Sequence, residues 1–377
     1  MNILITGGAG FIGSNLTHHL IAHGHTVTVL DNLSPQIHGS DPATTSPLYR
    51  GVRDQVRFVL GSVSDESAWR EVLPGQQAIV HLAAETGTGQ SMYEIKRYVD
   101  VNIGGTALML DLLANGTHSV EKIVVASSRS IYGEGKYRSE ATGIIYPGAR
   151  KASDLDAGKF EPLCPTTGAP LIALATDEDS KIHPSSVYGI TKQNQEQMVM
   201  TVCSSLNIGA TALRYQNVYG PGQSLSNPYT GILSIFSTRI KNGNGINIFE
   251  DGKESRDFVY IDDIVEATTA ALFRDTSSGE VFGIGSGVAT DVVTVATTLA
   301  RQYATDVPIS ITGNYRLGDI RHNYADLTKA TNLLGFTPKI GFEEGIKKFA
   351  EWVDRQEVQT DHYDASIEEM KKRGLYK

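Results

Sequence analysis

A tyrosine and a lysine stand four residues apart in the segment Tyr188-Gly-Ile-Thr-Lys192. On a helix, residues four apart share a face, so the phenol and the ammonium would lie side by side. An ammonium near a phenol lowers the pKa of the phenol and favours phenolate, which can take a proton from a hydroxyl group. Pairs with this spacing are also common on helix surfaces, so the pair indicates acid–base chemistry only in combination with other groups.

Further hydroxyl groups follow an apolar run in the segment Val-Val-Ala-Ser-Ser-Arg-Ser-Ile-Tyr-Gly, residues 124–133. The run predicts a buried strand, and Ser127, Ser128 and Ser130 stand where that strand ends. A serine at the carboxyl end of a parallel strand faces the crevice in which such sheets bind ligands. There it could contact the same substrate oxygen as Tyr188, while structural roles for Ser127 and Ser130 remain open.

The first apolar run leads into a glycine turn, Gly7-Gly8-Ala9-Gly10-Phe11-Ile12-Gly13, with the pattern G-x-x-G-x-x-G. Its glycines permit a tight turn, close approach of the backbone to a pyrophosphate, and close packing of the next helix, whose N-terminus attracts phosphate. Asp31 ends the second predicted strand, where an acid binds ribose hydroxyls. Its charge would repel a 2′-phosphate, so the sequence predicts NAD rather than NADP.

These groups require a framework that brings strand ends together. Apolar runs predict strands at 3–6, 26–30, 56–60, 78–82, 122–126 and 210–215, and amphipathic segments predict helices at 11–23, 93–113 and 186–203. Alternation of strands with helices predicts an α/β fold, a Rossmann-type doubly wound parallel sheet. Residues 133–183 break the alternation and indicate a long loop or small subdomain.

The second half of the chain is more irregular. Helices are expected near 230–241, 262–273, 292–301 and 342–354, followed by a charged surface helix or loose tail at 356–377. We therefore expect an NAD-binding domain at 1–220, with an inserted loop at about 133–183. A smaller C-terminal substrate-binding lobe would occupy most of 221–377, with about 256–275 returning to the first domain.

Composition narrows the class of protein. The net charge of −9 and the absence of a basic stripe argue against nucleic-acid binding. Cys164 and Cys203 are too few for a disulfide framework and lack metal-ligand spacing, so no metal is expected. Neither a signal peptide nor a long apolar run is evident. We expect a cytoplasmic protein without a membrane partner.

Taken together, the motifs resemble those of the extended short-chain dehydrogenases/reductases, and within them the sugar-nucleotide epimerase/dehydratase family. The resemblance extends from Met1 to about Trp352. It rests on the glycine turn, the serines and the Tyr188/Lys192 pair, and also on His81-Leu-Ala-Ala84, Asn102-Ile-Gly-Gly-Thr106, Leu213-Arg-Tyr-Gln-Asn-Val-Tyr-Gly-Pro221 and Arg256-Asp-Phe-Val-Tyr-Ile-Asp-Asp263.

The resemblance implies a role for each matching residue. Catalysis would involve Ser128, Tyr188 and Lys192. The nucleotide-sugar substrate would contact Ser128, Arg129, Asn217, Arg256 and Arg316. The expected NAD contacts are Gly7, Gly10, Phe11, Ile12, Gly13, Asp31, Asn32, Ser62, Val63, Leu82, Ala83, Ala84, Asn102, Tyr188 and Lys192. Two departures stand out: Ser62 replaces an acid usual in the family, and the separation between Ser128 and Tyr188 is longer than usual.

Dehydratases of this family carry Thr-Asp-Glu where this chain has Ser128-Arg129-Ser130. Guanidinium is a poor acid and a poor base, so water elimination lacks its catalysts and 4-epimerisation through a keto sugar is favoured. The segment 164–171, Cys-Pro-Thr-Thr-Gly-Ala-Pro-Leu, resembles the branch that acts on dTDP-L-rhamnose, and UDP-glucose 4-epimerases are also similar. A 4-ketoreductase, a 4,6-dehydratase and a non-enzymatic NAD-sensing regulator remain alternatives.

Assembly is the last expectation. The predicted helices at 93–113 and 186–203 carry apolar residues on more than one face. Equivalent helices in the family pair across a two-fold axis, so the resemblance implies a homodimer.

Overall fold

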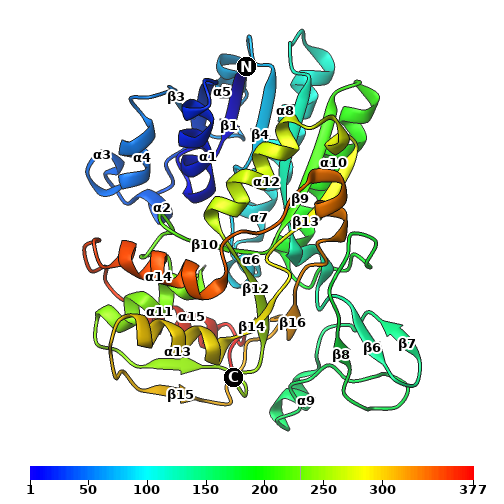
Figure 1. The fold of residues 1–377 in the computed structure, drawn as a ribbon, viewed down its shortest axis with the longest axis vertical. Coiled ribbons are helices and arrows are strands. Elements are labelled where there is room, and N and C mark those ends of the chain that lie inside the picture. Colours follow the sequence, from blue (N-terminus) through cyan, green and yellow to red (C-terminus); the bar gives the residue numbers. More distant parts are fainter. Residues whose placement is uncertain (230) are drawn as a thin grey trace.

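A seven-stranded parallel sheet forms the centre of the computed structural model, which describes residues 1–229 and 231–377 (Figure 1). The strand order is β13-β9-β5-β4-β1-β2-β3, and every pair is parallel. The order reverses between β1 and β4, which creates the crevice of a doubly wound sheet. The strands are β1 (Asn2–Thr6), β2 (Thr26–Asp31), β3 (Arg57–Leu60), β4 (Ala78–His81), β5 (Lys122–Ser128), β9 (Gly209–Tyr215) and β13 (Glu280–Ile284).

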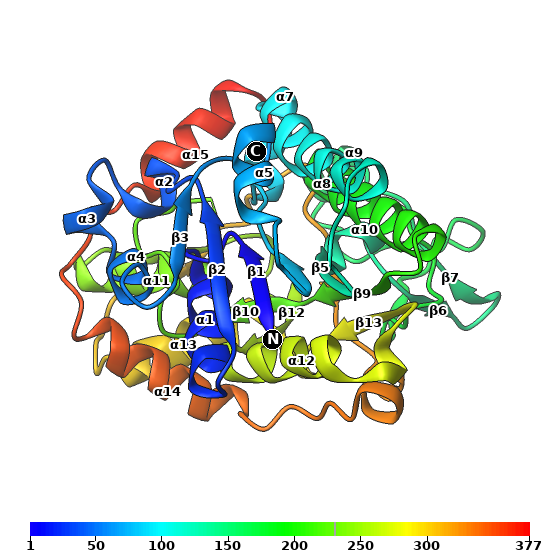
Figure 2. The same cartoon turned by 90° about the horizontal axis from the view of Figure 1, so that it is seen from above.

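Helices cover both faces of this sheet (Figure 2). Alternate side chains of a strand point to opposite faces, so Ile3 and Ile5 pack with α1 and α12, whereas Leu4 packs with α5, α8 and α10. These helices are α1 (Phe11–Ala22), α5 (Glu66–Val72), α8 (Gly105–Asn115), α10 (Val187–Ser205) and α12 (Ile261–Phe273). The predicted α/β fold is confirmed, including the strands inferred from apolar runs.

Other predicted elements differ in detail. The helix expected over 93–113 consists of α7 (Ile95–Tyr98), a π-helical segment (Val99–Gly104) and α8. Short helices follow β2 and β4: α2 (Pro35–His38), α3 (Pro42–Thr45), α4 (Pro47–Val52) and α6 (Thr88–Ser91). Strand β13 was not expected in the main sheet, since the sequence placed only about 256–275 of the second half there. The exact domain boundaries stay a prediction.

A smaller lobe follows β9 and lies at the carboxyl edge of the sheet (Figure 1). Its strands are β10 (Asn217–Tyr219), β11 (Ile246–Ile248), β12 (Ser255–Tyr260), β14 (Ala289–Asp291), β15 (Ile309–Ile311) and β16 (His322–Asn323). Its helices are α11 (Ile232–Lys241), α13 (Val292–Gln302), α14 (Phe342–Val353) and α15 (Tyr363–Lys372). Thr230, the expected start of α11, lies outside the described residues. Among those described, no helix combines the length and apolar character that crossing a bilayer needs.

The segment 133–183 forms a small subdomain, one of the two possibilities inferred from the sequence. Its three antiparallel strands are β6 (Tyr137–Ser139), β7 (Gly143–Ile145) and β8 (Ile172–Ala173), and α9 (Ala152–Asp156) lies between β7 and β8. Tyr137, Cys164 and Leu171 form its buried core. In Figure 1 it projects beside the smaller lobe.

Buried ion pairs join this subdomain to the smaller lobe. The Arg321 guanidinium is fully buried and lies 2.7 Å from a carboxylate oxygen of Glu161 and 2.8 Å from one of Glu250. Arg150, in the subdomain, also pairs with Glu250, at 2.8 Å. Because an unpaired buried charge costs several kcal/mol, the two parts are held in one relative position.

Candidate functional site

The glycine turn between β1 and α1 has the geometry of a phosphate cradle. A Cβ on Gly7 would lie 2.9 Å from the amide nitrogen of Ala83, and a Cβ on Gly13 would lie 2.2 Å from the carbonyl oxygen of Gly7. Both positions therefore exclude any larger residue. Gly7 also has a φ of +69°, which favours glycine. The N-terminus of α1 consequently opens directly onto the crevice, as anion binding requires.

Asp31 lies at the end of β2 and is almost completely buried. Its carboxylate accepts hydrogen bonds from the backbone amides of Ala9 (3.0 Å) and Leu33 (2.9 Å). Burial raises the pKa of Asp31, while these amides and the nearby His38 oppose the rise. The carboxylate is thus fixed beside the glycine turn, where a ribose hydroxyl can approach it.

The remaining predicted cofactor residues fall into two groups. Those that line the crevice are Phe11, Ile12, Asn32, Ser62, Val63, Leu82, Ala83 and Ala84. Asn102 lies behind the wall instead. Its side-chain oxygen accepts a hydrogen bond from the Glu85 amide, and its side-chain nitrogen donates to the Glu85 carbonyl and the Thr191 hydroxyl. Asn102 therefore positions the segment after β4 against α10.

These features fit a dinucleotide. The two glycines leave room for a pyrophosphate, the helix N-terminus supplies amide donors, and Asp31 supplies a ribose acceptor. Ser62 stands at the crevice wall where an acid is usual, and its hydroxyl accepts a hydrogen bond from the Ser64 amide.

The serine cluster lies at the carboxyl end of β5, as expected. The Ser128 hydroxyl accepts hydrogen bonds from the backbone amide of Ser130 (3.1 Å) and from the Ser130 hydroxyl (2.9 Å). Ser127 points elsewhere and donates to Glu196 at 2.6 Å. Ser128 is thus the hydroxyl presented to the crevice, Ser130 supports it, and Ser127 has a structural contact.

Tyr188 and Lys192 lie on α10, which begins with Ser186 capping the amide of Gly189. Both line the same cavity as Ser128. The Lys192 ammonium donates to the Ala126 carbonyl at 2.9 Å, and burial lowers the pKa of Lys192 to about 7.

Burial and two neighbouring groups act on the pKa of Tyr188. Burial raises the pKa of Tyr188, and the two groups that oppose this rise are the Ser128 hydroxyl and the Arg129 guanidinium. That Lys192 lowers this pKa stays a prediction. Its ammonium is directed to the end of β5, and Arg129 provides the positive charge.

Arg129 lies at the cavity wall and has a neutral hydrogen-bond partner there. Its Nε donates to the side-chain oxygen of Asn217 at 3.1 Å. Burial and the charge of Arg256 lower the pKa of Arg129 to about 9. Arg129 lines the cavity, and a salt bridge from it to the inserted segment, an alternative considered for this residue, is not found among the described residues.

Two more arginines complete the substrate side. Arg256, on β12, donates to the backbone carbonyls of Ser255, Ile320 and Arg321. The Arg316 guanidinium lies 2.7 Å from a carboxylate oxygen of Asp319. Both residues line the cavity, so all five predicted substrate residues line the same cavity as Tyr188 and Lys192.

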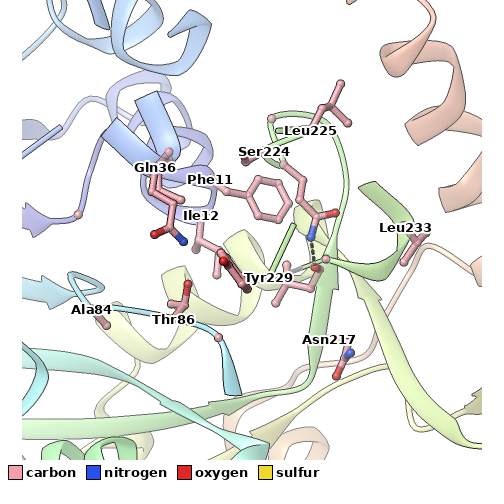
Figure 3. A pocket seen from close by; sticks show the side chains of 18 of the residues that line it. Phe11, Ile12, Gln36, Ala84, Thr86, Asn217, Ser224, Leu225, Tyr229 and Leu233 are labelled. Carbon is pink, nitrogen blue, oxygen red and sulfur yellow. Dashed lines mark hydrogen bonds between the residues drawn. The ribbon is translucent and has the colours of Figure 1, made fainter. Parts of the chain in front are cut away.

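The cavity between the sheet and the smaller lobe has a volume of about 1230 Å³. Figure 3 shows Phe11, Ile12, Ala84 and Thr86 on its cofactor side, opposite Asn217 and Leu233. This volume exceeds the usual range for sites that bind one small ligand. It can accommodate a dinucleotide and a second ligand together.

Several wall residues were not predicted. Tyr229, Phe249 and Asp319 line the cavity, and so do Gln356 and Tyr363 from the expected tail. Phe249 follows β11 in an apolar run and had no pattern to separate it from core residues. Asp319 had a signal, since it stands three residues after Arg316.

Residues 3–150 and 166–285 match the NAD dependent epimerase/dehydratase family. This match covers well over half of the chain, and the chain belongs to that family. NAD is accordingly its cofactor, and the glycine turn and Asp31 have the geometry to bind it.

Individual relatives agree with this assignment. A dTDP-L-rhamnose 4-epimerase from Burkholderia thailandensis is 38% identical over 356 residues, 94% of this chain and 95% of that protein. The structure of a UDP-glucose 4-epimerase from Thermotoga maritima with UDP-glucose has a TM-score of 0.72 and 31% identity, covering 94% of this chain and 99% of that one. MoeE5 in complex with UDP-glucuronic acid and NAD has a TM-score of 0.73, 27% identity and the same coverage.

Replacing Asp31 with alanine should weaken NAD binding about tenfold, because the ribose loses a charged acceptor. The same change should reduce the preference for NAD over NADP. Calorimetric titration of the cofactor-depleted protein with each dinucleotide measures both effects. Asp54→Ala, at an exposed acid, is the matched control. Tighter binding of NADP than NAD by the unmodified protein would contradict the assignment.

Proposed function

We propose that this protein is an NAD-dependent nucleotide-sugar 4-epimerase. The observation that carries the proposal is the convergence of Ser128, Tyr188 and Lys192 on a cavity that also holds Arg129 and Arg256. The first three residues suit removal of a hydroxyl proton, and the arginines suit a diphosphate. Family membership and the named relatives support the same activity.

In the proposed reaction, Tyr188 as phenolate removes the proton from the sugar 4-hydroxyl. Ser128 donates a hydrogen bond to the same oxygen and orients it, and Lys192 binds the nicotinamide ribose. NAD, when bound, accepts a hydride from C4 and returns it. The 4-keto sugar rotates within the cavity, and Tyr188 then gives its proton back to the oxygen of that sugar. Tyr188 would supply the rate enhancement of roughly 10²–10⁴-fold that is typical of acid–base catalysis.

The local charge around Tyr188 favours epimerisation over elimination. Dehydration of a 4-keto sugar needs an acid and a base beside the reacting carbons. Among the residues that the structure describes, the charged side chain that shifts the pKa of Tyr188 is Arg129, a cation. Ser130 is engaged with Ser128, and a lone serine hydroxyl is too weakly acidic for the task.

For the substrate, we propose a dTDP-linked 6-deoxyhexose, with dTDP-L-rhamnose first. Support comes from the relative of that name and from the 164–171 segment before α10. UDP-glucose is the second candidate, since a structural relative contains it. A net 4-ketoreductase would use the same residues but would consume NADH.

Incubation of the NAD-loaded protein with dTDP-L-rhamnose should yield an isomer of equal mass that is inverted at C4. Mass spectrometry and NMR identify the product. Tyr188→Phe should lower the rate at least about 10²-fold without loss of bound NAD. With UDP-glucose, which carries a 6-hydroxyl, a product lighter by one water would establish a dehydratase. Conversion of dTDP-L-rhamnose to a 4-keto sugar with stoichiometric formation of NADH from NAD would establish a reductase.

Arg129→Met should move the rising limb of kcat/KM against pH to higher pH by up to about one unit. Phenolate is the active form of Tyr188, and loss of the nearby positive charge raises the pKa at which it forms. Arg129→Lys, which keeps a charge, should shift the limb less. An unchanged pH profile in Arg129→Met would rule out this electrostatic role.

We also propose that the protein forms a homodimer through α7 and α10, which lie side by side (Figure 2). Ile95 and Ile190 are about half exposed there, at 51% and 45%. Light scattering at micromolar concentration should give the mass of a dimer, and Ile95→Asp should give a monomer. Ile144→Asp, at an exposed residue of β7, is the control; a monomeric unmodified protein would disprove the proposal. The cytoplasmic location stays a prediction from the sequence.

A further inference from the structure

Residues 359–377, here the C-terminal segment, pack against the wall of the cavity. Tyr363, Ile367, Met370 and Tyr376 are buried and form a small core with Phe249 and Ile235. Figure 2 shows α15, in red, along the outer edge of the molecule with one end close to α7. The loose tail that the sequence allowed is therefore replaced by an ordered helix with a buried face.

This segment pairs with the backbone on both sides of Arg316. The Tyr315 amide donates to the Lys377 carbonyl at 2.8 Å, the Lys377 amide donates to the Tyr315 carbonyl at 3.1 Å, and the Leu317 amide donates to the Leu375 carbonyl at 3.0 Å. These hydrogen bonds form a short antiparallel ladder in which Arg316 lies opposite Tyr376. The backbone position of Arg316 thus depends on the C-terminal segment.

Side chains reinforce the same contact. The ring of Tyr376 meets the ring of Phe249 edge to face, with centroids 5.3 Å apart. The Arg316 guanidinium also contacts Phe249 and lies 5.1 Å from the centroid of its ring. Because Arg316 and Phe249 both line the cavity, Tyr376 supports two wall residues without lining the cavity itself.

The opposite side of α15 reaches the cofactor domain. The Arg373 guanidinium lies 4.0 Å from the centroid of the Tyr93 ring, which stands between α6 and α7. The Tyr229 hydroxyl donates to Glu369 at 2.9 Å. The segment therefore spans the cavity from the substrate lobe to the cofactor domain.

We infer that the C-terminal segment is a positioning element of the nucleotide-diphosphate site. It fixes Arg316 through the backbone ladder and Phe249 through Tyr376, so that the guanidinium meets the diphosphate without further ordering. Ordering a free arginine side chain on binding costs affinity. The contacts of the Arg316 guanidinium with Phe249 and Asp319, on a backbone held by the ladder, reduce that cost. The inference rests on the proposed function for the identity of the ligand.

The test is calorimetric titration of the NAD-loaded full chain with dTDP. Tyr376→Ala should weaken binding about tenfold, and Tyr376→Phe, which keeps the ring, should restore most of the affinity. Lys377→Pro, which removes one amide donor of the ladder, should also weaken binding. Lys372→Ala, on the exposed side of α15, is the matched control and should bind as the unmodified protein does.

A double-mutant cycle with Arg316→Ala separates positioning from general destabilisation. If Tyr376 acts through Arg316, Tyr376→Ala should cause little additional loss in the Arg316→Ala background. The inference would be overturned if the Tyr376→Ala and Lys377→Pro proteins were folded and bound dTDP with unchanged affinity. It would also be overturned if the affinity loss of the double variant equalled the product of the losses of the two single variants. The readout is independent of turnover: a protein that binds dTDP in this way but yields no C4 isomer refutes the proposed function alone.

Discussion

The parallel pairing of β1 with both β2 and β4 is the constraint on which the site depends. Because all seven strands run the same way, their carboxyl ends meet at one edge of the sheet. The glycine turn, Asp31 and Ser128 come from the ends of three different strands and reach a common crevice only for this reason. The smaller lobe then closes the crevice by contributing Asn217 and Arg256 from two paired strands.

Burial determines how these groups behave. In water, an adjacent ammonium would lower the pKa of a phenol by less than about one unit. In the folded protein, desolvation raises the pKa of Tyr188 and lowers that of Lys192. The environment thus opposes both charged forms, and Arg129 becomes the group that compensates. This cation stands where related dehydratases carry an acid, so the proposed activation of Tyr188 and the proposed choice of reaction both depend on Arg129.

Neighbouring parts of the chain hold the substrate arginines in place from two directions. On one side, the inserted subdomain reaches the Asp319 backbone through Arg150 and is tied to the smaller lobe by the buried Arg321 pairs. On the other, the C-terminal segment pairs with the backbone around Arg316. The inserted subdomain and the C-terminal segment therefore both contact the loop that carries Arg316 and Asp319 and hold its backbone in place.

The sequence by itself determined the sheet, the glycine turn and the hydroxyls that reach the cavity, those of Ser128 and Tyr188. Each is local: apolar runs specify buried strands, glycines specify a turn without Cβ atoms, and a four-residue spacing places Tyr188 beside Lys192. Tertiary structure alone decided which charge acts on Tyr188, that Asn102 lies behind the wall, that β13 joins the main sheet, and that residues 359–377 pack against Phe249. Those outcomes depend on contacts between residues far apart in the chain and on desolvation, which no local pattern of residue types encodes.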